Sequence, residues 1–297
     1  MATATSAPPA NIGKYRIERE LGRGASGIVY LGLDGFRGRK VAIKQTHAHL
    51  LKVPEQAERY RKLLRNEAAL SGRLRHPNIV RLLDADEEAL PPYLVLEYVD
   101  GQPLSAYATP DALLPVPQVL DIAFKCCNAL EYACREGLVH RDIKPANLML
   151  AKDGDIKLTD FGAAMFTANQ RTQVEGVGSP AYMSPQQVRE MPLNHPTDIY
   201  SLGVVLYQLL AGELPFQASN NYSLVYQIIH VEPPPPSVHR PGLPPALDAV
   251  VARAMHKDIA LRYANWTEFT HDLAQAFRNR RLRPRDEDSD AAEHFRL

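Results

Sequence analysis

The sequence predicts an α+β protein in which a small antiparallel β lobe with one helix precedes a larger, mainly helical lobe. Short β-like segments bounded by turn residues fill residues 15–99, with one helix-like segment among them. From residue 100 to residue 277 the long segments instead have helical periodicity. The 297 residues are enough for one large domain or for two lobes packed on each other. We therefore expect a domain over residues 15–277, with lobes of residues 15–99 and 100–277.

The first lobe is expected to contain one helix and five short strands. The helix covers Glu55–Leu74 and ends before Pro77, because proline disfavours the α conformation in the residue that precedes it. The expected strands are Tyr15–Leu21, Ile28–Leu33, Lys40–Gln45, Ile79–Leu83 and Tyr93–Glu97.

The second lobe is expected to contain one hairpin and several helices. Asp153-Gly154 is a strong two-residue turn signal between the strands Leu148–Leu150 and Ile156–Leu158. The three cysteines, Cys126, Cys127 and Cys134, lie inside the expected helix Val116–Glu136. We expect them to be small buried side chains of a protein in a reducing compartment. The expected helices are Val116–Glu136, Asp198–Ala211, Leu247–Met255 and Trp266–Phe277.

The ends and the charge of the chain exclude several classes of protein. Residues 1–14 have the composition of a flexible lead-in and lack the features of a signal peptide, and residues 278–297 have that of a flexible polar tail. The longest apolar runs, such as Ile199–Leu210, are too short to span a bilayer. Lys+Arg and Asp+Glu are equal at 34 each, so no basic excess attracts nucleic acid or anionic lipid. We expect a soluble cytoplasmic protein that binds neither nucleic acid nor membrane.

A glycine-rich turn follows the first expected strand. Gly22, Gly24 and Gly27 form the pattern GxGxxG, which also occurs in dinucleotide-binding turns. That alternative requires a helix directly after the glycines, whereas here they run into the β-like segment Ile28–Leu31. The spacing favours a hairpin whose backbone N–H groups lie over phosphates.

Lys44 ends the apolar segment Val41–Lys44 of an expected strand. Most lysines at strand ends are simply solvated, and a buried one is costly unless it is paired. Glu67, on the same face of the expected helix as Leu63 and Leu70, is the candidate partner. Such an ion pair would direct the ammonium at phosphates and make the helix position control the activity.

The segment His140–Asn147 (HRDIKPAN), followed by Asp160-Phe161-Gly162, resembles the catalytic and metal-binding loops of the eukaryotic-like protein kinase family, bacterial type. The resemblance covers about residues 15–277 and implies the two-lobed protein kinase fold. Its other marks follow in order: the glycine-rich turn, Val41–Lys44, Glu67, Gly178-Ser179-Pro180, Asp198 with Ser201-Leu202-Gly203, Gly212 with Pro215-Phe216, and Arg262.

The resemblance implies a role for each catalytic residue. Asp142 would orient the substrate hydroxyl in line with the γ-phosphorus, and Lys144 would contact the γ-phosphate. Asn147 and Asp160 would hold two Mg²⁺ ions, with Mn²⁺ as a possible substitute. The expected ATP contacts are Leu21, Gly22, Gly24, Gly27, Val29, Ala42, Lys44, Leu96, Glu97, Val99 and Met149, and the backbone of residues 97–99 would bond the adenine edge.

The same resemblance indicates protein Ser/Thr residues as the substrates. Lys144, two residues after Asp142, is typical of Ser/Thr kinases, and Ser179 matches a hydroxyl position that contacts both residues. Ala146 and Gln208 occupy places where relatives that act near arginine carry acidic residues. We therefore expect no strong preference for basic residues just upstream of the target.

Three further positions concern regulation and stability. Arg141 beside Asp142 is typical of kinases controlled by phosphorylation of the activation loop, for which Thr172 and Thr167 are candidate acceptors. Gln186 stands where the family has a glutamate that pairs with an arginine matching Arg262, so this anchor is expected to be weaker. Ser71 replaces a leucine common in relatives, which suggests that a partner or a second copy holds the active state, with autophosphorylation in trans in a homodimer.

Two alternatives remain at this point. A pseudokinase would bind nucleotide and signal by conformation, and a small-molecule kinase would share the fold but lack the complete series of marks around the substrate platform. The chain ends soon after the domain, which predicts a soluble enzyme that receives its signal from a separate protein.

Overall fold

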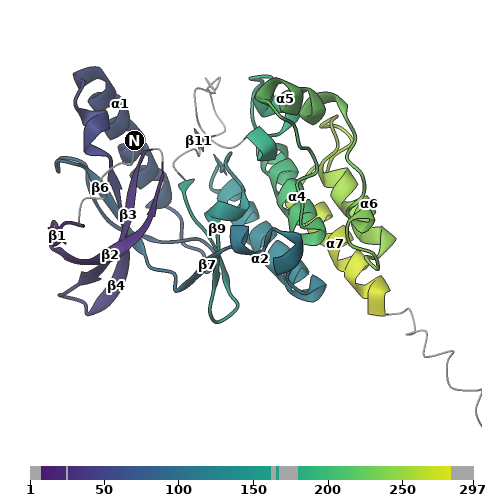
Figure 1. Cartoon of the computed structure of the whole chain (residues 1–297), viewed down its shortest axis with the longest axis horizontal. Helices are drawn as coiled ribbons and strands as arrows, with labels where there is room; N and C mark the ends of the chain where they lie inside the picture. Colours follow the sequence, from purple (N-terminus) through teal and green to yellow (C-terminus); the bar gives the residue numbers. More distant parts are fainter. Residues whose placement is uncertain (1–7, 25, 162–164, 167–179, 282–297) are drawn as a thin grey trace, which may run out of the picture.

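The computed structural model describes residues 8–24, 26–161, 165–166 and 180–281. Figure 1 shows two lobes, with the sheet and helix α1 on one side and a bundle of helices on the other. The expected α+β, two-lobed architecture is confirmed. Residues 98–100, which follow the last strand of the first lobe, link the two lobes.

The first lobe is built on a six-stranded antiparallel sheet with the strand order β1-β2-β3-β4-β6-β5. A separate apolar cluster of this lobe includes Tyr30, Val41, Ile43 and Val95. The strands are β1 (Asn11–Ile12), β2 (Tyr15–Arg23), β3 (Gly27–Asp34), β4 (Arg39–Thr46), β5 (Leu82–Asp86) and β6 (Tyr93–Glu97).

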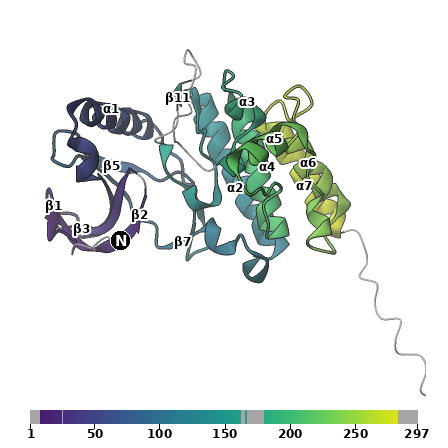
Figure 2. The ribbon, with the colours of Figure 1, turned by 45° about the horizontal axis from the view of Figure 1, so that its top comes forward.

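Helix α1 (Pro54–Ser71) lies across one face of this sheet, as Figures 1 and 2 show, after the short 3-10 helix η1 (Ala48–Leu51). Only a narrow stripe of it is buried, and Glu67 lies on that stripe beside Leu64 and Leu70. The helix ends at Ser71, three residues before the expected end, because Gly72 closes the last turn with a bond from its N–H to the carbonyl of Ala68. The buried stripe places Glu67 within hydrogen-bonding distance of Lys44 on β4.

One expectation for the first lobe is wrong. Residues 79–81 are not part of a strand, because the N–H of Val80 donates to the carbonyl of Leu158 in the second lobe, and Ile79 forms a parallel bridge to Leu158. Strand β5 therefore starts only at Leu82. In the expected lead-in, residues 1–7 lie outside the described residues, and the buried Ile12 of β1 pairs with Tyr15 of β2.

The second lobe is held by one large apolar core around helix α4, most of which is buried. A small sheet of order β10-β9-β7 lies between the helices and the first lobe (Figure 1). The helices are α2 (Val116–Arg135), α3 (Pro185–Val188), α4 (His195–Ala211), α5 (Asn221–His230), α6 (Pro245–Ala254) and α7 (Trp266–Arg281). The 3-10 helices are η2 (Leu104–Tyr107), η3 (Pro110–Ala112), η4 (Pro145–Asn147), η6 (Pro180–Tyr182) and η7 (Pro236–Val238).

The remaining strands place the loops that carry chemistry. The strands are β7 (Gly101–Pro103), β8 (Leu138–Val139), β9 (Leu148–Ala151), β10 (Ile156–Leu158) and β11 (Met165–Phe166). The expected hairpin of β9 and β10 is present, but residues 152–155 form its loop, with Gly154 at φ +87°. Helix α7 continues to Arg281, four residues into the expected tail, and residues 282–297 lie outside the described residues.

Candidate active site

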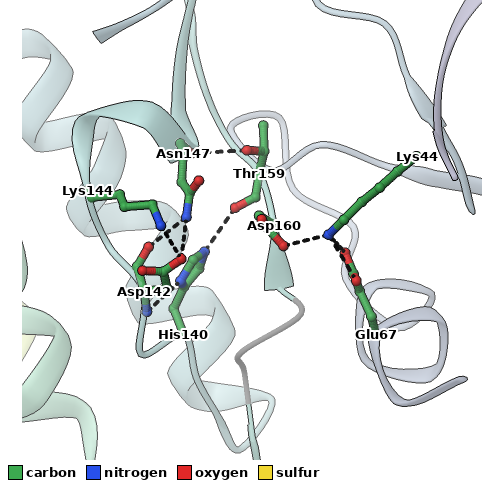
Figure 3. A network of polar contacts seen from close by, with 8 residues as sticks. All are labelled: Lys44, Glu67, His140, Asp142, Lys144, Asn147, Thr159 and Asp160. Atoms are coloured by element: carbon green, nitrogen blue, oxygen red, sulfur yellow. Dashed lines mark hydrogen bonds and ion pairs between the residues drawn. The ribbon is translucent and has the colours of Figure 1, made fainter. Parts of the chain in front are cut away.

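Lys44 on β4 connects the two lobes through two carboxylates (Figure 3). Its Nζ donates to Oε1 and Oε2 of Glu67 at 2.9 and 3.1 Å and to Oδ1 of Asp160 at 2.8 Å. Glu67 comes from α1 in the first lobe, and Asp160 comes from the segment that follows β10 in the second. The expected Lys44–Glu67 ion pair is therefore present, and the position of α1 determines whether it forms.

The charges around Lys44 keep it protonated. Burial alone would lower the pKa of this ammonium, because the group loses hydration inside the protein. The charges of Glu67 and Asp160 and their hydrogen bonds outweigh burial and raise the pKa. Lys44 is thus a fixed cation at neutral pH, which is the property that a phosphate-binding lysine needs.

A second cluster lies opposite Lys44, on the loop between β8 and β9. Oδ2 of Asp142 accepts hydrogen bonds from Nζ of Lys144 at 2.7 Å and from Nδ2 of Asn147 at 3.0 Å. Nδ2 of Asn147 also donates to the backbone carbonyl of Asp142 at 2.8 Å. These bonds hold the side chain of Asp142 in one orientation, and among the described residues none donates to its Oδ1.

Asp198 on α4 holds the backbone of this loop in place through two hydrogen bonds. Its Oδ2 accepts from the N–H of His140 at 2.7 Å and its Oδ1 from the N–H of Arg141 at 2.8 Å. Arg141 has φ +70°, a left-handed conformation that costs energy in a residue with a side chain. Asp198 is 3% exposed, so its two bonds supply the compensation that burying a carboxylate needs. The anchor explains how the loop holds Asp142 despite its strained neighbour.

His140 joins this loop to the segment that carries Asp160. Its ring packs on Phe161 with centroids 4.6 Å apart, and its Nε2 lies 3.1 Å from the carbonyl oxygen of Thr159. The N–H of Thr159 in turn donates to the carbonyl of Asn147 at 2.9 Å. Asp160 has φ +62°, so its side chain is aimed by a backbone that these contacts hold in place. Sequence reasoning missed the contacts of His140 and Asp198, although an acidic residue inside an otherwise apolar helix was a usable signal.

The expected ATP contacts come from adjacent strands. Val29 pairs with Lys44 across β3 and β4, Ala42 pairs with Leu96 across β4 and β6, and all of these side chains are partly exposed. Met149 on β9, also partly exposed, comes from the other lobe. The strands thus bring together the residues expected around an adenine ring, and their contact with ATP stays a prediction.

The glycine-rich turn has a clear backbone requirement at Gly27. A Cβ at this position would lie 2.2 Å from the carbonyl oxygen of Gln45, so no larger residue fits without moving β4. The N–H of Gly24 donates to the carbonyl of Gly27 at 2.9 Å and closes the turn. The expected helix-free hairpin is confirmed, while its binding to phosphates stays a prediction.

The side-chain oxygens of Asn147 and Asp160 are suitable ligands for a hard divalent cation such as Mg²⁺. The amide nitrogen of Asn147 is used by Asp142, which leaves the amide oxygen as its possible metal ligand, and Asp160 adds a carboxylate. Figure 3 shows both near Thr159, which donates its N–H to the carbonyl of Asn147 and precedes Asp160 in the chain. Within the described residues no group of three or more His, Cys, Asp or Glu forms a metal site of its own. Such a sparse oxygen set suits an ion that is held mainly by substrate phosphates.

Gln186 accepts the predicted hydrogen bond from Arg262. Nη2 of Arg262 lies 3.2 Å from Oε1 of Gln186, and the guanidinium also donates to the carbonyls of Pro196 at 2.7 Å and of His256 at 2.9 Å. Burial lowers the pKa of Arg262 to about 10, because no carboxylate touches it at this depth among the described residues. The neighbouring Gln187 donates through Nε2 to the carbonyl of Arg141 at 2.8 Å, which the sequence did not suggest.

The structure describes some of the expected regulatory and substrate positions. Arg141 lies on the catalytic loop as described above, and Oε1 of Gln208 accepts a hydrogen bond from the hydroxyl of Tyr182 at 2.7 Å. Ser71 is buried at the end of α1. Thr167, Thr172 and Ser179 lie outside the described residues.

Comparison with known proteins identifies the family. Residues 15–272 match the model of the family described as protein kinase domain. The chain belongs to the protein kinase family. Among the relatives in this family, the serine/threonine-protein kinase PknB of Mycobacterium leprae is 38% identical over 273 residues, which is 90% of this chain and 43% of that protein. The serine/threonine-protein kinase Pkn1 of Myxococcus xanthus is 38% identical over 275 residues, which is 89% of this chain and 38% of that protein.

Membership of the protein kinase family implies the use of ATP and of a divalent metal ion. The chain spans about two-fifths of the length of these curated relatives. Over the residues that the structure describes, none of the helices combines the length and the apolarity that crossing a bilayer requires.

Proposed function

We propose that this chain is a Ser/Thr protein kinase that transfers the γ-phosphoryl group of ATP to protein hydroxyls. The observation that carries the proposal is the pair of facing clusters, with Asp142, Lys144 and Asn147 on one side and Lys44 and Asp160 on the other. A scaffold that only bound nucleotide would need no carboxylate held by two donors at the acceptor position.

In the proposed reaction, Asp142 positions the nucleophile. Lys144 and Asn147 hold its Oδ2, so Oδ1 accepts the hydrogen bond of the substrate hydroxyl and takes its proton as the P–O bond forms. Lys144 then neutralises charge that develops on the transferred group. Lys44, which is held by Glu67, binds the phosphates that stay behind.

Asn147 and Asp160 are the proposed metal ligands, and Mg²⁺, with Mn²⁺ as a substitute, is the proposed ion. Both offer oxygen atoms, which hard cations prefer, and the bound ion would shield the phosphate charges. The other expected ATP contacts are also proposed to bind ATP. The pairing of β3, β4 and β6 supports this, because it places Val29, Ala42 and Leu96 close to Lys44.

Lys144 and the named relatives support serine and threonine as acceptors. The test is incubation of the purified protein with γ-labelled ATP, Mg²⁺ and myelin basic protein, followed by acid hydrolysis of the labelled product. Label on phosphoserine and phosphothreonine is the expected result. Label on phosphotyrosine alone, or on a small molecule and not on protein, would contradict the proposal.

We also propose that the enzyme phosphorylates its own activation segment in trans, at Thr172 or Thr167. The support is Arg141, whose pKa burial lowers and whose charge an added phosphate would stabilise. The test mixes active enzyme with Asp142→Asn protein of different length and maps label on the inactive copy. Label on Thr172 is expected, and an unlabelled inactive copy would contradict the proposal.

We place the enzyme in the cytoplasm. The described thiols of Cys126, Cys127 and Cys134 are free rather than bonded, which agrees with a reducing compartment where ATP is available. Immunodetection of the protein in fractionated cells tests this location.

A further inference from the structure

A pocket beside the interlobe linker concentrates positive charge away from the proposed reaction centre. Its volume is about 610 Å³, and it meets the expected ATP contacts at Glu97 and Tyr98 of the segment 97–99. We call it the linker pocket. Its lining residues are Arg39, Lys40, Arg75, His76, Pro77, Arg81, Leu83, Glu97, Tyr98 and Lys157.

The charge of the linker pocket is far from balanced. Five of its side chains are Arg or Lys and one, Glu97, is a carboxylate, although the whole chain has a net charge of zero. Lys157 pairs with Glu97 at 2.8 Å, and Arg39 lies 3.7 Å from Asp34, a residue outside the pocket lining. Throughout the described ranges, Lys40, Arg75 and Arg81 form no ion pair. Like charges that face one another across a pocket repel, and a bound anion would remove that repulsion.

The positive charge of the pocket also affects the titration of His76. The pKa of His76 is lowered by burial and by the charge of Lys157. His76 therefore remains neutral near pH 7 and supplies a ring that stacks on Tyr132, with centroids 5.4 Å apart. Among the described residues, none accepts a hydrogen bond from the buried Nε of Arg39. The lining of the pocket thus includes one polar group that those residues leave unsatisfied.

The walls of the linker pocket come from both lobes. Arg39 and Lys40 start β4, and Arg81 precedes β5, in the first lobe. Lys157 lies on β10, and the loop of Arg75 is tied to the second lobe by a bond from its N–H to the hydroxyl of Tyr132 at 3.0 Å. A dianion that contacts Arg81 and Arg75 together would join the start of β5 to the loop that is bonded to the second lobe.

We propose that the linker pocket binds a phosphorylated serine or threonine side chain of a protein partner. Arginine forks match phosphate oxygens in geometry and charge, and the volume of the pocket exceeds what a phosphate alone needs. Pro77, Leu83 and Tyr98 add apolar surface for the residues that flank the phosphate. The choice of phosphoprotein rests on the proposed function, because a Ser/Thr kinase makes this group itself. A phosphorylated protein would thereby be retained beside the active site for a further transfer.

The test measures binding without catalysis, so that it is independent of the proposed activity. Asp142→Asn protein is titrated into a fluorescein-labelled peptide of Gly, Ser and Asp around one phosphothreonine, and anisotropy is recorded. The same peptide with threonine, and inorganic phosphate as competitor, are the controls for the ligand. The double variant Arg75→Ala/Arg81→Ala is compared with Arg16→Ala/Arg19→Ala, which removes two exposed arginines of β2 outside the pocket. Melting temperatures establish that both variants are folded.

We expect the phosphopeptide to bind at least about tenfold more tightly than the threonine peptide, because charge-assisted hydrogen bonds are made to the phosphate alone. Arg75→Ala/Arg81→Ala should weaken this binding by about tenfold or more, and the β2 variant should change it by less than about twofold. Added salt should weaken binding in the parent protein. Equal binding of both peptides, equal binding by the two double variants, or binding of free phosphate alone would overturn the proposal.

Discussion

At the scale of single residues, Asp142 and Lys144 act as one unit. The 2.7 Å bond from Lys144 holds one oxygen of Asp142, and the two side chains are about equally shielded from solvent. Lys144 therefore does two things in the proposed reaction, since it orients the carboxylate and supplies charge for the transferred group. A lysine on the surface cannot do either.

Replacing Lys144 tests that interpretation. Lys144→Ala should lower kcat by about two orders of magnitude or more, with little effect on KM for ATP, because the lost charge matters mainly in the transition state. Steady-state kinetics with a peptide substrate would measure both constants. Lys152→Ala is the matched control and should leave kcat unchanged, because the ion pair of Lys152 with Asp100 is exposed to solvent. A variant of Lys144 with full kcat would contradict the assignment.

Lys257 gives a residue-scale prediction about stability. Its ammonium lies 4.1 Å from the ring centroid of Phe216 and donates to the carbonyl of Ile228, and burial lowers its pKa from 10.5 to about 8. Between about pH 8 and pH 10.5 the unfolded chain therefore binds a proton that the folded chain has released. The contribution of Lys257 to the free energy of unfolding should rise with pH over this window.

Urea unfolding at several pH values checks this effect. Lys257→Met keeps the length of the side chain over Phe216 and removes the titrating group, so its free energy of unfolding should rise less between pH 8 and pH 10 than that of the parent. Lys62→Met, at an exposed position of α1, is the control and should keep the parent slope. Identical slopes in all three proteins would contradict the prediction.

At the scale of elements, helix α3 and Arg262 form an anchor under the catalytic loop. Ser184 caps α3 with a reciprocal bond to Gln187, and Gln187 also donates to the loop at Arg141. Gln186, one residue earlier, faces the buried guanidinium of Arg262. The two adjacent glutamines thus have different roles: Gln186 accepts a hydrogen bond from Arg262, and Gln187 holds the catalytic loop at Arg141.

Substituting each glutamine by glutamate separates these roles. Gln186→Glu should raise the free energy of unfolding by about 1 kcal/mol, because a charged bond to Arg262 replaces a neutral acceptor. Gln187→Glu should lower it by about as much or more, since the carbonyl of Arg141 loses its donor. Thermal unfolding should show shifts of opposite sign, of about 2–4 °C per kcal/mol. Shifts of the same sign would contradict the assignment of the two side chains.

Much of this anchor could be predicted from the sequence, and some could not. Gln186 was expected to bond Arg262 because the resemblance to the kinase family places a glutamate that pairs with an arginine at these positions, whereas the capping box of Ser184 was overlooked. The start of β5 was misplaced because Val80 satisfies its N–H with Leu158 of the other lobe. Apolar alternation predicts that a segment is buried, but it does not tell which partner accepts its hydrogen bonds.

At the scale of the whole molecule, the site exists only where the lobes meet. The first lobe contributes Lys44 and Glu67, and the second contributes Asp142, Asn147 and Asp160 (Figure 3). The short motifs predicted these residues, because each motif is local and its chemistry needs fixed spacing. The contacts that hold the motifs in place join distant segments, such as α4 with the catalytic loop, and spacing along the chain does not predict them.

In the proposed mechanism, Asp142 takes part in the chemistry, while the opposite cluster of Lys44 and Asp160 binds the nucleotide. The most direct test compares the parent and Asp142→Asn in two assays, binding of ATP with Mg²⁺ by calorimetry and transfer of labelled phosphate to protein. We predict that the variant binds ATP within about threefold of the parent, because Asp142 faces the acceptor, and that it loses phosphoryl transfer by about three orders of magnitude. Undiminished transfer by the variant, or absence of transfer in the parent despite ATP binding, would contradict the account.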